Sequence, residues 1–249
     1  MAAREAKNQS VLQPGLREPV NRRERRRLQT RERIFRAALQ LFAERGFLAT
    51  AVEDITDAAD VGKGTFFNYF PTKEHVFDAL GELQLAKLEA FANRADSRNL
   101  SIRQLLRRAA RALAEEPGRS PSLVRSMLQA ILTNDAVREG IGQKLERARR
   151  LLAGIFKTGQ RRGEVRADLQ PMELARVFQQ AFFGTLWVWS IYPSQPLAAW
   201  FSDIFTVFWS GIEEHHKRRG SSDTARDQIE VTGSPATVVA RRSREGVKL

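Results

Sequence analysis

The chain has 249 residues, a net charge of +12 and no cysteine, which excludes disulfides and thiolate metal sites. Only three histidines occur, His75, His215 and His216. Few residues are therefore available for a histidine metal site or a Ser-His-Asp triad. The positive charge sits at the two ends: residues 1–45 hold 12 Lys/Arg against 5 Asp/Glu, and residues 217–249 hold 8 against 4. A near-neutral body with a basic end is typical of a domain that contacts a polyanion at one place.

The two ends of the chain lack sustained periodicity, and we expect residues 1–20 and 218–249 to be disordered tails. No apolar stretch of signal-peptide type occurs near the N-terminus. The longest apolar region, Ala181–Tyr192, has 12 residues, whereas a spanning helix needs about 20. We therefore expect a cytoplasmic protein with no membrane partner, no metal and no cofactor.

Between the tails the apolar residues follow helical spacing throughout. The first helix has an apolar stripe from Ile34 to Phe42, with Thr30 as the expected N-cap and Gly46 as the stop. Capping signals predict further helices from Thr50 (a capping box with Glu53), Thr72, Ser101 and Ser120. With the remaining expected helices, the set covers residues 30–46, 50–59, 63–69, 72–94, 101–116, 120–134, 136–162, 171–191 and 196–217. The predicted class is all-α, with about nine helices.

The segment Asp60–Phe70 contains Gly62-Lys63-Gly64-Thr65, which has the residue types of a phosphate-binding loop. That loop needs Gly, four residues and then Gly-Lys-Ser/Thr, placed after a strand. Here Gly64 follows Lys63, Asp57 stands where the earlier glycine is required, and residues 54–59 are helical in pattern. A nucleotide-binding enzyme is therefore the most remote alternative.

A helix-turn-helix accounts for more of the same segment. Val52, Ile55 and Ala59 form one apolar stripe, and Phe66 and Phe70 form an i, i+4 pair on the next helix. A three-residue turn, 60–62, suits two helices that meet at a steep angle. The other face of the second helix then carries groups able to meet base edges and phosphates, with glycine backbone open to a phosphate. These groups are Gly64, Thr65, Asn68 and Tyr69.

Three ordered segments extend this pattern: "AALQLFAERGF" (37–47), "TAVEDITDAADVGKGTFFNYF" (50–70) and "PTKEHVF" (71–77). On these residues the chain resembles the TetR family of bacterial transcriptional regulators. The resemblance implies a homodimer in which each subunit has a three-helix DNA-binding head and a six-helix body that senses a ligand and dimerises. It also carries contacts with double-stranded operator DNA onto Thr50, Lys63, Thr65, Phe67, Asn68, Tyr69 and Lys73.

Three residues depart from the family pattern. Asp60 stands where the family usually has glycine, and Asp tolerates a left-handed backbone better than most residues. Gly62 replaces a serine cap, and glycine is a weaker but acceptable cap. Phe67 replaces a frequent tyrosine, so it lacks the hydroxyl for a phosphate hydrogen bond and is left with packing on sugar or a thymine methyl.

The segment "NRRERRR" (21–27) has five arginines in seven residues. It is either a solvated, disordered charge run or an arm that supplies cations to the head. The second interpretation gains weight because residues 46–73 carry only two lysines against four acidic residues. We expect the arm to lie along phosphates or enter the adjacent minor groove. Its residues are Arg22, Arg23, Arg25, Arg26 and Arg27.

The last two expected helices are apolar around nearly their whole circumference, which indicates burial on more than one side. A four-helix contact between two subunits would cover them, and the alternative is that both are central helices of a monomer. The predicted dimer interface comprises Ala181, Thr185, Val188, Trp200, Ile204 and Phe208. The predicted effector pocket is lined by Phe91, Met127, Ile131, Phe156, Phe178 and Phe182.

The predicted organisation is a tail (1–20), an arm and head (21–71), a body (72–217) and a basic tail (218–249) to which no function is assigned. The function that fits is a dimeric repressor that binds a palindromic operator and is released by a small hydrophobic or aromatic effector. A DNA-binding regulator with no small-molecule input is the alternative. The sequence names neither the effector nor the operator.

Overall fold

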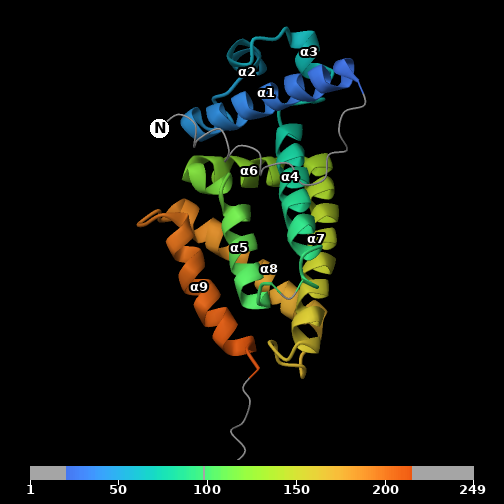
Figure 1. Ribbon diagram of the computed structural model, residues 1–249. Coiled ribbons are helices and arrows are strands. Elements are labelled where there is room, and N and C mark those ends of the chain that lie inside the picture. The colour runs from blue at the N-terminus through green and yellow to red at the C-terminus, as the bar shows by residue number, and fades with distance from the viewer. Residues whose placement is uncertain (1–20, 98, 215–249) are drawn as a thin grey trace, which may run out of the picture. The chain divides into compact units, whose positions relative to one another are not determined.

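The computed structural model describes residues 21–97 and 99–214, and both predicted tails lie outside these residues. The described part is all-α, as predicted, with nine α-helices and one short 3-10 helix (Figure 1). The elements are α1 (Arg22–Arg45), α2 (Val52–Ala58), α3 (Lys63–Phe67), α4 (His75–Ala92), α5 (Ile102–Ala114), η2 (Pro117–Arg119), α6 (Pro121–Thr133), α7 (Asp135–Arg161), α8 (Pro171–Ile191) and α9 (Leu197–Ile212). None of these helices is long and apolar enough to cross a membrane.

The first three helices enclose a small aromatic core. Ile34, Phe42, Ile55 and Phe66 have no exposed surface. These residues come from α1, α2 and α3, and they are the apolar positions that helical spacing places on inward faces. The predicted three-helix head is therefore present.

The head shares its core with the body. The cluster that contains the head residues also contains Phe77 and Leu80 of α4 and Leu123 of α6. The ring of Phe77 stacks on Phe42 with centroids 5.1 Å apart. The Phe47 N–H donates to Ser126 Oγ at 3.0 Å, which ties the end of α1 to α6. A movement of α4 or α6 therefore changes the packing of the head directly.

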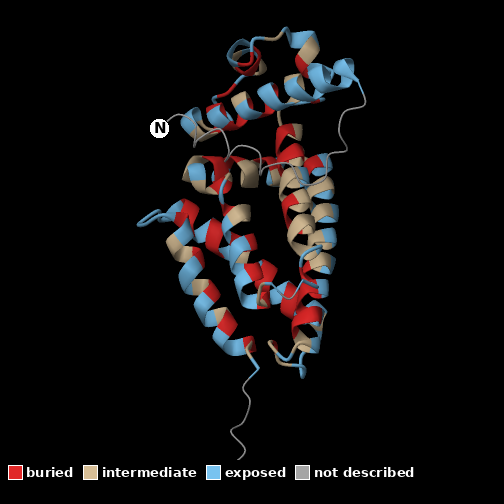
Figure 2. Cartoon of the chain, viewed as in Figure 1, coloured by how far each residue is buried: buried red, intermediate tan, exposed pale blue. Residues whose placement is uncertain are grey.

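The body packs around two further apolar clusters. One lies among α4, α5, α7, α8 and α9 and includes the fully buried Leu106 and Phe156. The other joins α6, α8 and α9 through residues such as Leu186 and Phe201. Figure 2 shows these buried positions as stripes on the inward sides of the helices. The clusters hold α5 against α4 on one side and α9 on the other.

Three predicted helix starts are wrong, near Thr30, Thr50 and Thr72. The first helix begins at Arg22 and not at Thr30, because the Asn21 carboxamide oxygen accepts from two N–H groups of the first turn at 3.0 Å each. Arginine is a good helix former, so the charge run continues the helix. Near Thr50 the N-cap is Ala51, whose N–H donates to the Asp54 carboxylate at 2.7 Å.

The starts at Ser101 and Ser120 are confirmed by their capping hydrogen bonds. Gly46 is confirmed as the C-cap of α1, with a φ of 85° that favours glycine. Thr72 caps nothing through its side chain: α4 begins at His75 after a turn, and the Thr72 hydroxyl lies 3.0 Å from His75 Nδ1.

Candidate nucleic-acid interface

The turn between α2 and α3 has the backbone that its residues predict. Asp60 has a φ of 50°, the left-handed region that Asp tolerates. Gly62 is the N-cap of α3, and its carbonyl accepts from the Thr65 N–H at 2.9 Å. Because the helix α2 precedes this turn, the segment differs from the strand-to-helix geometry of a nucleotide-binding loop.

The helix α3 has a buried side and an outward side. Phe66 is fully buried and Phe70 is 1% exposed. Phe67 is 49% exposed, with its ring edge-on to Phe66 at a centroid distance of 5.4 Å. Asn68 is exposed, and Thr65 and Tyr69 are half-buried. The side chains with hydrogen-bonding groups are thus on the surface of α3.

Gly64 lies in the first turn of this outward side. A Cβ placed on Gly64 would meet no atom within 4 Å in the part of the chain that the structure describes. No neighbour inside the head therefore requires glycine here. The absence of a side chain leaves the start of α3 open to close approach by a ligand.

Lys63 is paired within the head in the described conformation. Its ammonium group forms an ion pair with the Glu53 carboxylate of α2, and both side chains are more than half exposed. The hydrogen bond from Lys63 lowers the pKa of Glu53 below its ordinary value. Glu53 is therefore ionised at neutral pH, and its negative charge would oppose the approach of a phosphate to Lys63.

The side chains of Thr50 and Lys73 both donate hydrogen bonds to backbone carbonyls of the loop between α1 and α2. Thr50 has no exposed surface, and its hydroxyl donates to the Gly46 carbonyl at 2.7 Å. The Lys73 ammonium donates to the carbonyls of Phe47 and Thr50 at 2.9 Å each and lies 4.4 Å from the Phe47 ring centroid. Their polar groups are engaged inside the protein, so the predicted DNA contacts of these two residues stay predictions.

The five arginines of residues 21–27 lie in the first two turns of α1. The interpretation of this run as disordered is wrong for the described residues, and all five side chains are exposed. Arg23, Arg26 and Arg27 line a concave surface that Tyr69 of the α3 region also lines. The remaining lining residues are Asn21, Glu24 and Thr30. The structure thus places cations beside the outward side of α3.

Comparisons with known proteins support the same assignment. Residues 34–80 match the family model TetR_N, described as bacterial regulatory proteins of the tetR family. The chain is 30% identical over 159 residues to the transcriptional regulator AcuR of Cereibacter sphaeroides, an alignment that covers 61% of this chain and 73% of AcuR. The chain belongs to the TetR family.

Two further relatives agree. The transcriptional repressor KstR of Mycobacterium tuberculosis is 26% identical over 160 residues, which are 64% of this chain and 70% of KstR. The structure resembles Thermus thermophilus FadR, a TetR family transcriptional repressor solved in complex with lauroyl-CoA. That match has a TM-score of 0.55 and 31% identity, and it covers 80% of this chain and 100% of FadR. This TetR-family chain is accordingly a DNA-binding transcriptional repressor.

The body of this TetR-family repressor does not gather all six predicted pocket residues. Met127 and Ile131 pack against the cluster shared by head and body. Phe91 packs against the second cluster, to which Phe156 and Phe178 also belong, with those two rings 6.0 Å apart. Phe182 bridges the second and third clusters. The predicted pocket stays a prediction. Two of its six residues, Phe178 and Phe182, line the same small cavity.

The predicted dimer residues divide between surface and core. Val188 is 40% exposed, whereas Thr185 is buried and its hydroxyl donates to the Ala181 carbonyl. Trp200, Ile204 and Phe208 of α9 are half-buried. Sequence analysis missed more exposed apolar side chains on the same two helices: Val177, Phe183, Trp187, Ile191 and Val207. On a helix that is apolar all round, spacing alone does not reveal the outward side.

Proposed function

We propose that this TetR-family repressor acts as a dimer that binds a palindromic operator through α3 and is released by an apolar effector. The observation that carries the proposal is the two-sided α3, with Phe66 and Phe70 in the core and Asn68 on the surface. In this proposal the head comprises residues 21–71 and the body residues 72–217.

Sequence reading is assigned to the outward residues of α3 and phosphate binding to its flanks. Thr65 and Asn68 present short polar groups suited to base edges, and Phe67 offers an apolar surface to sugar or a thymine methyl. The open backbone at Gly64, the Lys63 ammonium and the Tyr69 hydroxyl are suited to phosphates. The arginines of α1 beside Tyr69 extend this phosphate surface.

The apolar surface of α8 and α9 supports dimerisation. Val177, Trp187 and Ile191 of α8 are each nearly half exposed, and Val207 of α9 is 74% exposed. Contiguous exposed apolar side chains on a folded chain mark an interaction surface. Pairing through a two-fold axis would place two copies of α3 in successive major grooves, about 34 Å apart or a multiple of this.

The helix α4 is suited to carry a signal between effector and head. Val76 and Phe77 at its start belong to the cluster shared with the head, and Leu88 near its end belongs to the body cluster. An effector that favours a different position of α4 therefore changes the placement of the head. FadR of Thermus thermophilus, solved with lauroyl-CoA, supports an apolar effector of this kind.

One observation favours the alternative of a regulator without an effector. The cavity lined by Phe178 and Phe182 has a volume of about 10 Å³, which holds about one water molecule. In the effector-responsive form of the proposal, the ligand opens this region on binding. In the alternative function, the body binds no effector and serves only for dimerisation.

Operator binding and its release test the proposal. The purified chain is mixed with fluorescent operator DNA, and anisotropy is measured for the unmodified chain and for Asn68→Ala. We expect Asn68→Ala to lose at least tenfold in affinity with an unchanged unfolding transition. A thermal-shift screen of apolar compounds then identifies binders, and an effector must also release the DNA. Unchanged affinity in Asn68→Ala contradicts the assigned role of α3.

A further inference from the structure

The outer face of α5 is a strongly basic stripe to which nothing above assigns a role. The helix holds four arginines and no acidic residue among its 13 positions. All four are exposed, whereas the opposite face packs into the body cluster. The arginines are Arg103, Arg107, Arg108 and Arg111.

Three of these cations form no ion pair among the described residues: Arg107, Arg108 and Arg111. Arg103 has a carboxylate partner, Glu213, at 3.8 Å. Elsewhere in the described body half of the exposed arginines form ion pairs, such as Arg147 with Glu89 and Arg150 with Glu146. The positions 103, 107 and 111 follow one another at about 6 Å along the helix axis, since each residue rises about 1.5 Å.

The stripe borders a seam between α5 and α9 that is aromatic underneath. Ala110 of α5 lines the small cavity together with α8 and α9 side chains, all apolar. These side chains are Phe178, Ala181, Phe182, Phe201, Ile204, Phe205 and Phe208. The rings of Phe182 and Phe201 stack at 4.4 Å and bring α8 and α9 together at this point.

An unused donor lies at the same seam. Trp209 of α9 is 2% exposed, and its indole N–H has no hydrogen-bond acceptor among the described residues. The Arg103 guanidinium lies 5.9 Å from the centroid of the same ring. A buried N–H without a partner is costly, and a ligand acceptor at this point would satisfy it.

We propose that the α5–α9 seam binds an amphipathic effector with an apolar chain and a polyphosphate head, of the acyl-coenzyme A class. The proposal rests on the proposed function and names its effector. Arg107 and Arg111 bind the phosphates of the head, and the chain enters the aromatic cavity beneath Ala110. A fatty acid carries one carboxylate, which leaves most of the stripe unmatched, whereas a coenzyme A head carries phosphates at two separated places.

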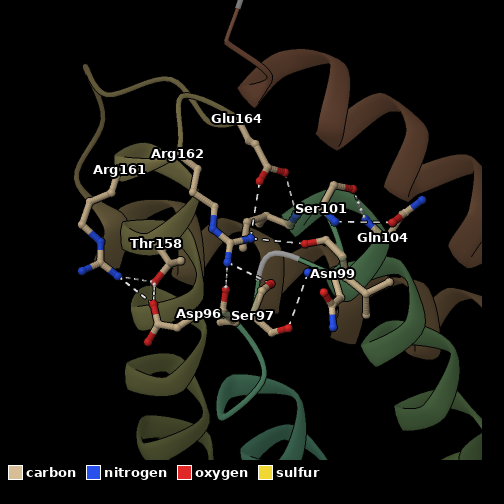
Figure 3. Close-up of polar contacts among 12 residues, drawn as sticks. Asp96, Ser97, Asn99, Ser101, Gln104, Thr158, Arg161, Arg162 and Glu164 are labelled. Atoms are coloured by element: carbon tan, nitrogen blue, oxygen red, sulfur yellow. Dashed lines mark hydrogen bonds and ion pairs between the residues drawn. The ribbon is translucent and has the colours of Figure 1, made fainter.

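Hydrogen bonds join both ends of α5 to neighbouring segments, so that a movement of α5 is transmitted to α4. At its start, the Ile102 N–H donates to the Glu164 carboxylate at 2.6 Å, and the Arg162 guanidinium donates to the Leu100 carbonyl at 3.2 Å (Figure 3). At its other end, the buried Lys87 of α4 donates to the Ala112 carbonyl at 2.8 Å and to Glu116. A ligand that shifts α5 therefore pulls on α4, which joins the head.

Direct binding to DNA-free protein tests the site. Isothermal titration calorimetry measures lauroyl-coenzyme A, coenzyme A and lauric acid binding to the full chain. The test variant is Arg107→Ala/Arg111→Ala, and the control is Arg147→Ala/Arg150→Ala, which removes the same charge from paired arginines of α7. We expect lauroyl-coenzyme A to bind at least tenfold more tightly than lauric acid, and to lose about tenfold in the test variant alone. Operator affinity without effector stays equal in all three proteins.

Three results overturn the inference. These are no binding of lauroyl-coenzyme A to the unmodified chain, equal binding by the two double variants, and equal binding of lauric acid and lauroyl-coenzyme A. Failure of the proposed function is distinct, because it appears as missing operator binding by the same unmodified preparation. An unfolded test variant is recognised by circular dichroism, and Arg107→Lys/Arg111→Lys then replaces it. That variant keeps the charge but lacks the planar guanidinium group. We therefore expect it to bind lauroyl-coenzyme A more weakly than the unmodified chain does, by less than the tenfold loss expected for the alanine variant.

Discussion

At the scale of single residues, Lys63 has two competing partners. In the free head it pairs with Glu53, and in the proposed complex it binds a phosphate. The pKa of Glu53 is lowered by this hydrogen bond, so the pair is present above the ordinary carboxylate pKa and is lost only as the pH falls through the lowered value. At neutral pH the carboxylate therefore competes with DNA at full strength.

Glu53→Gln should strengthen operator binding, because the amide does not compete with phosphate for Lys63. The expected gain is about twofold to fivefold, the range of an exposed ion pair. The gain should be the same at pH 6 and pH 8, since Glu53 is ionised at both. Anisotropy titrations at the two pH values measure it, and weaker binding by Glu53→Gln would show that Glu53 itself helps to hold the DNA.

Phe66 and Phe67 are neighbours with opposite exposure, and they form a matched pair for stability. Phe66→Ala should cost about 3–5 kcal/mol, since the ring is fully buried in the head core. Phe67→Ala should change stability by no more than about 0.5 kcal/mol, as expected at the surface. Urea denaturation measures both. Similar losses in the two variants would mean that the sides of α3 are assigned incorrectly.

At the scale of elements, the sequence predicted each helix of the head, the turn at residues 60–62 and two capping serines. These features depend on local spacing and on cap residues, which a sequence displays directly. It misplaced the start of α1, because Thr30 is also a good cap residue and the true cap, Asn21, stands before a charge run. An N-cap residue type followed by good helix formers was the available signal.

The body was less predictable for a physical reason. Helical spacing identifies apolar residues but not which neighbouring helix each one faces. The predicted pocket residues Met127 and Phe156 consequently fall in different clusters. The role of Lys73 depends on two carbonyls of the loop between α1 and α2, which lie far along the chain, so sequence spacing carries no signal for it. The same holds for the ring of Trp209, which lies beside Arg103 of a distant helix.

The basic start of α1 gives a prediction at the element scale. Arg26→Ala/Arg27→Ala removes two cations from the side that faces Tyr69, and Arg25→Ala/Arg36→Ala removes two from the opposite side. Because the proposed dimer loses two cations in each subunit, the first pair should weaken binding to all DNA sequences and flatten the salt dependence by a log–log slope of about 4, whereas the second should change it by less. DNA titrations at several salt concentrations measure the slopes. Equal slopes for the two double variants would contradict the assignment of phosphate contacts to the side of α1 that faces Tyr69.

At the scale of the whole molecule, the two-fold axis assigned to α8 and α9 decides whether two heads can read one operator. Val207→Glu places a charge on the most exposed apolar side chain of α9. It should shift the chain to monomers, because an unpaired charge in an apolar interface is costly. Leu132→Glu, at a similarly exposed position on α6, should leave the dimer intact. Sedimentation at micromolar concentration measures both, and a monomeric unmodified chain would rule out the dimer.

The most direct test of the DNA-binding dimer is selection of bound genomic DNA fragments by the unmodified chain, followed by sequencing. We predict one enriched motif with two-fold symmetry, whose half-site centres are separated by one helical turn, about 34 Å, or a multiple of it. Asn68→Ala should lose this enrichment while remaining folded. No enriched fragment, or a motif without two-fold symmetry, would contradict the account.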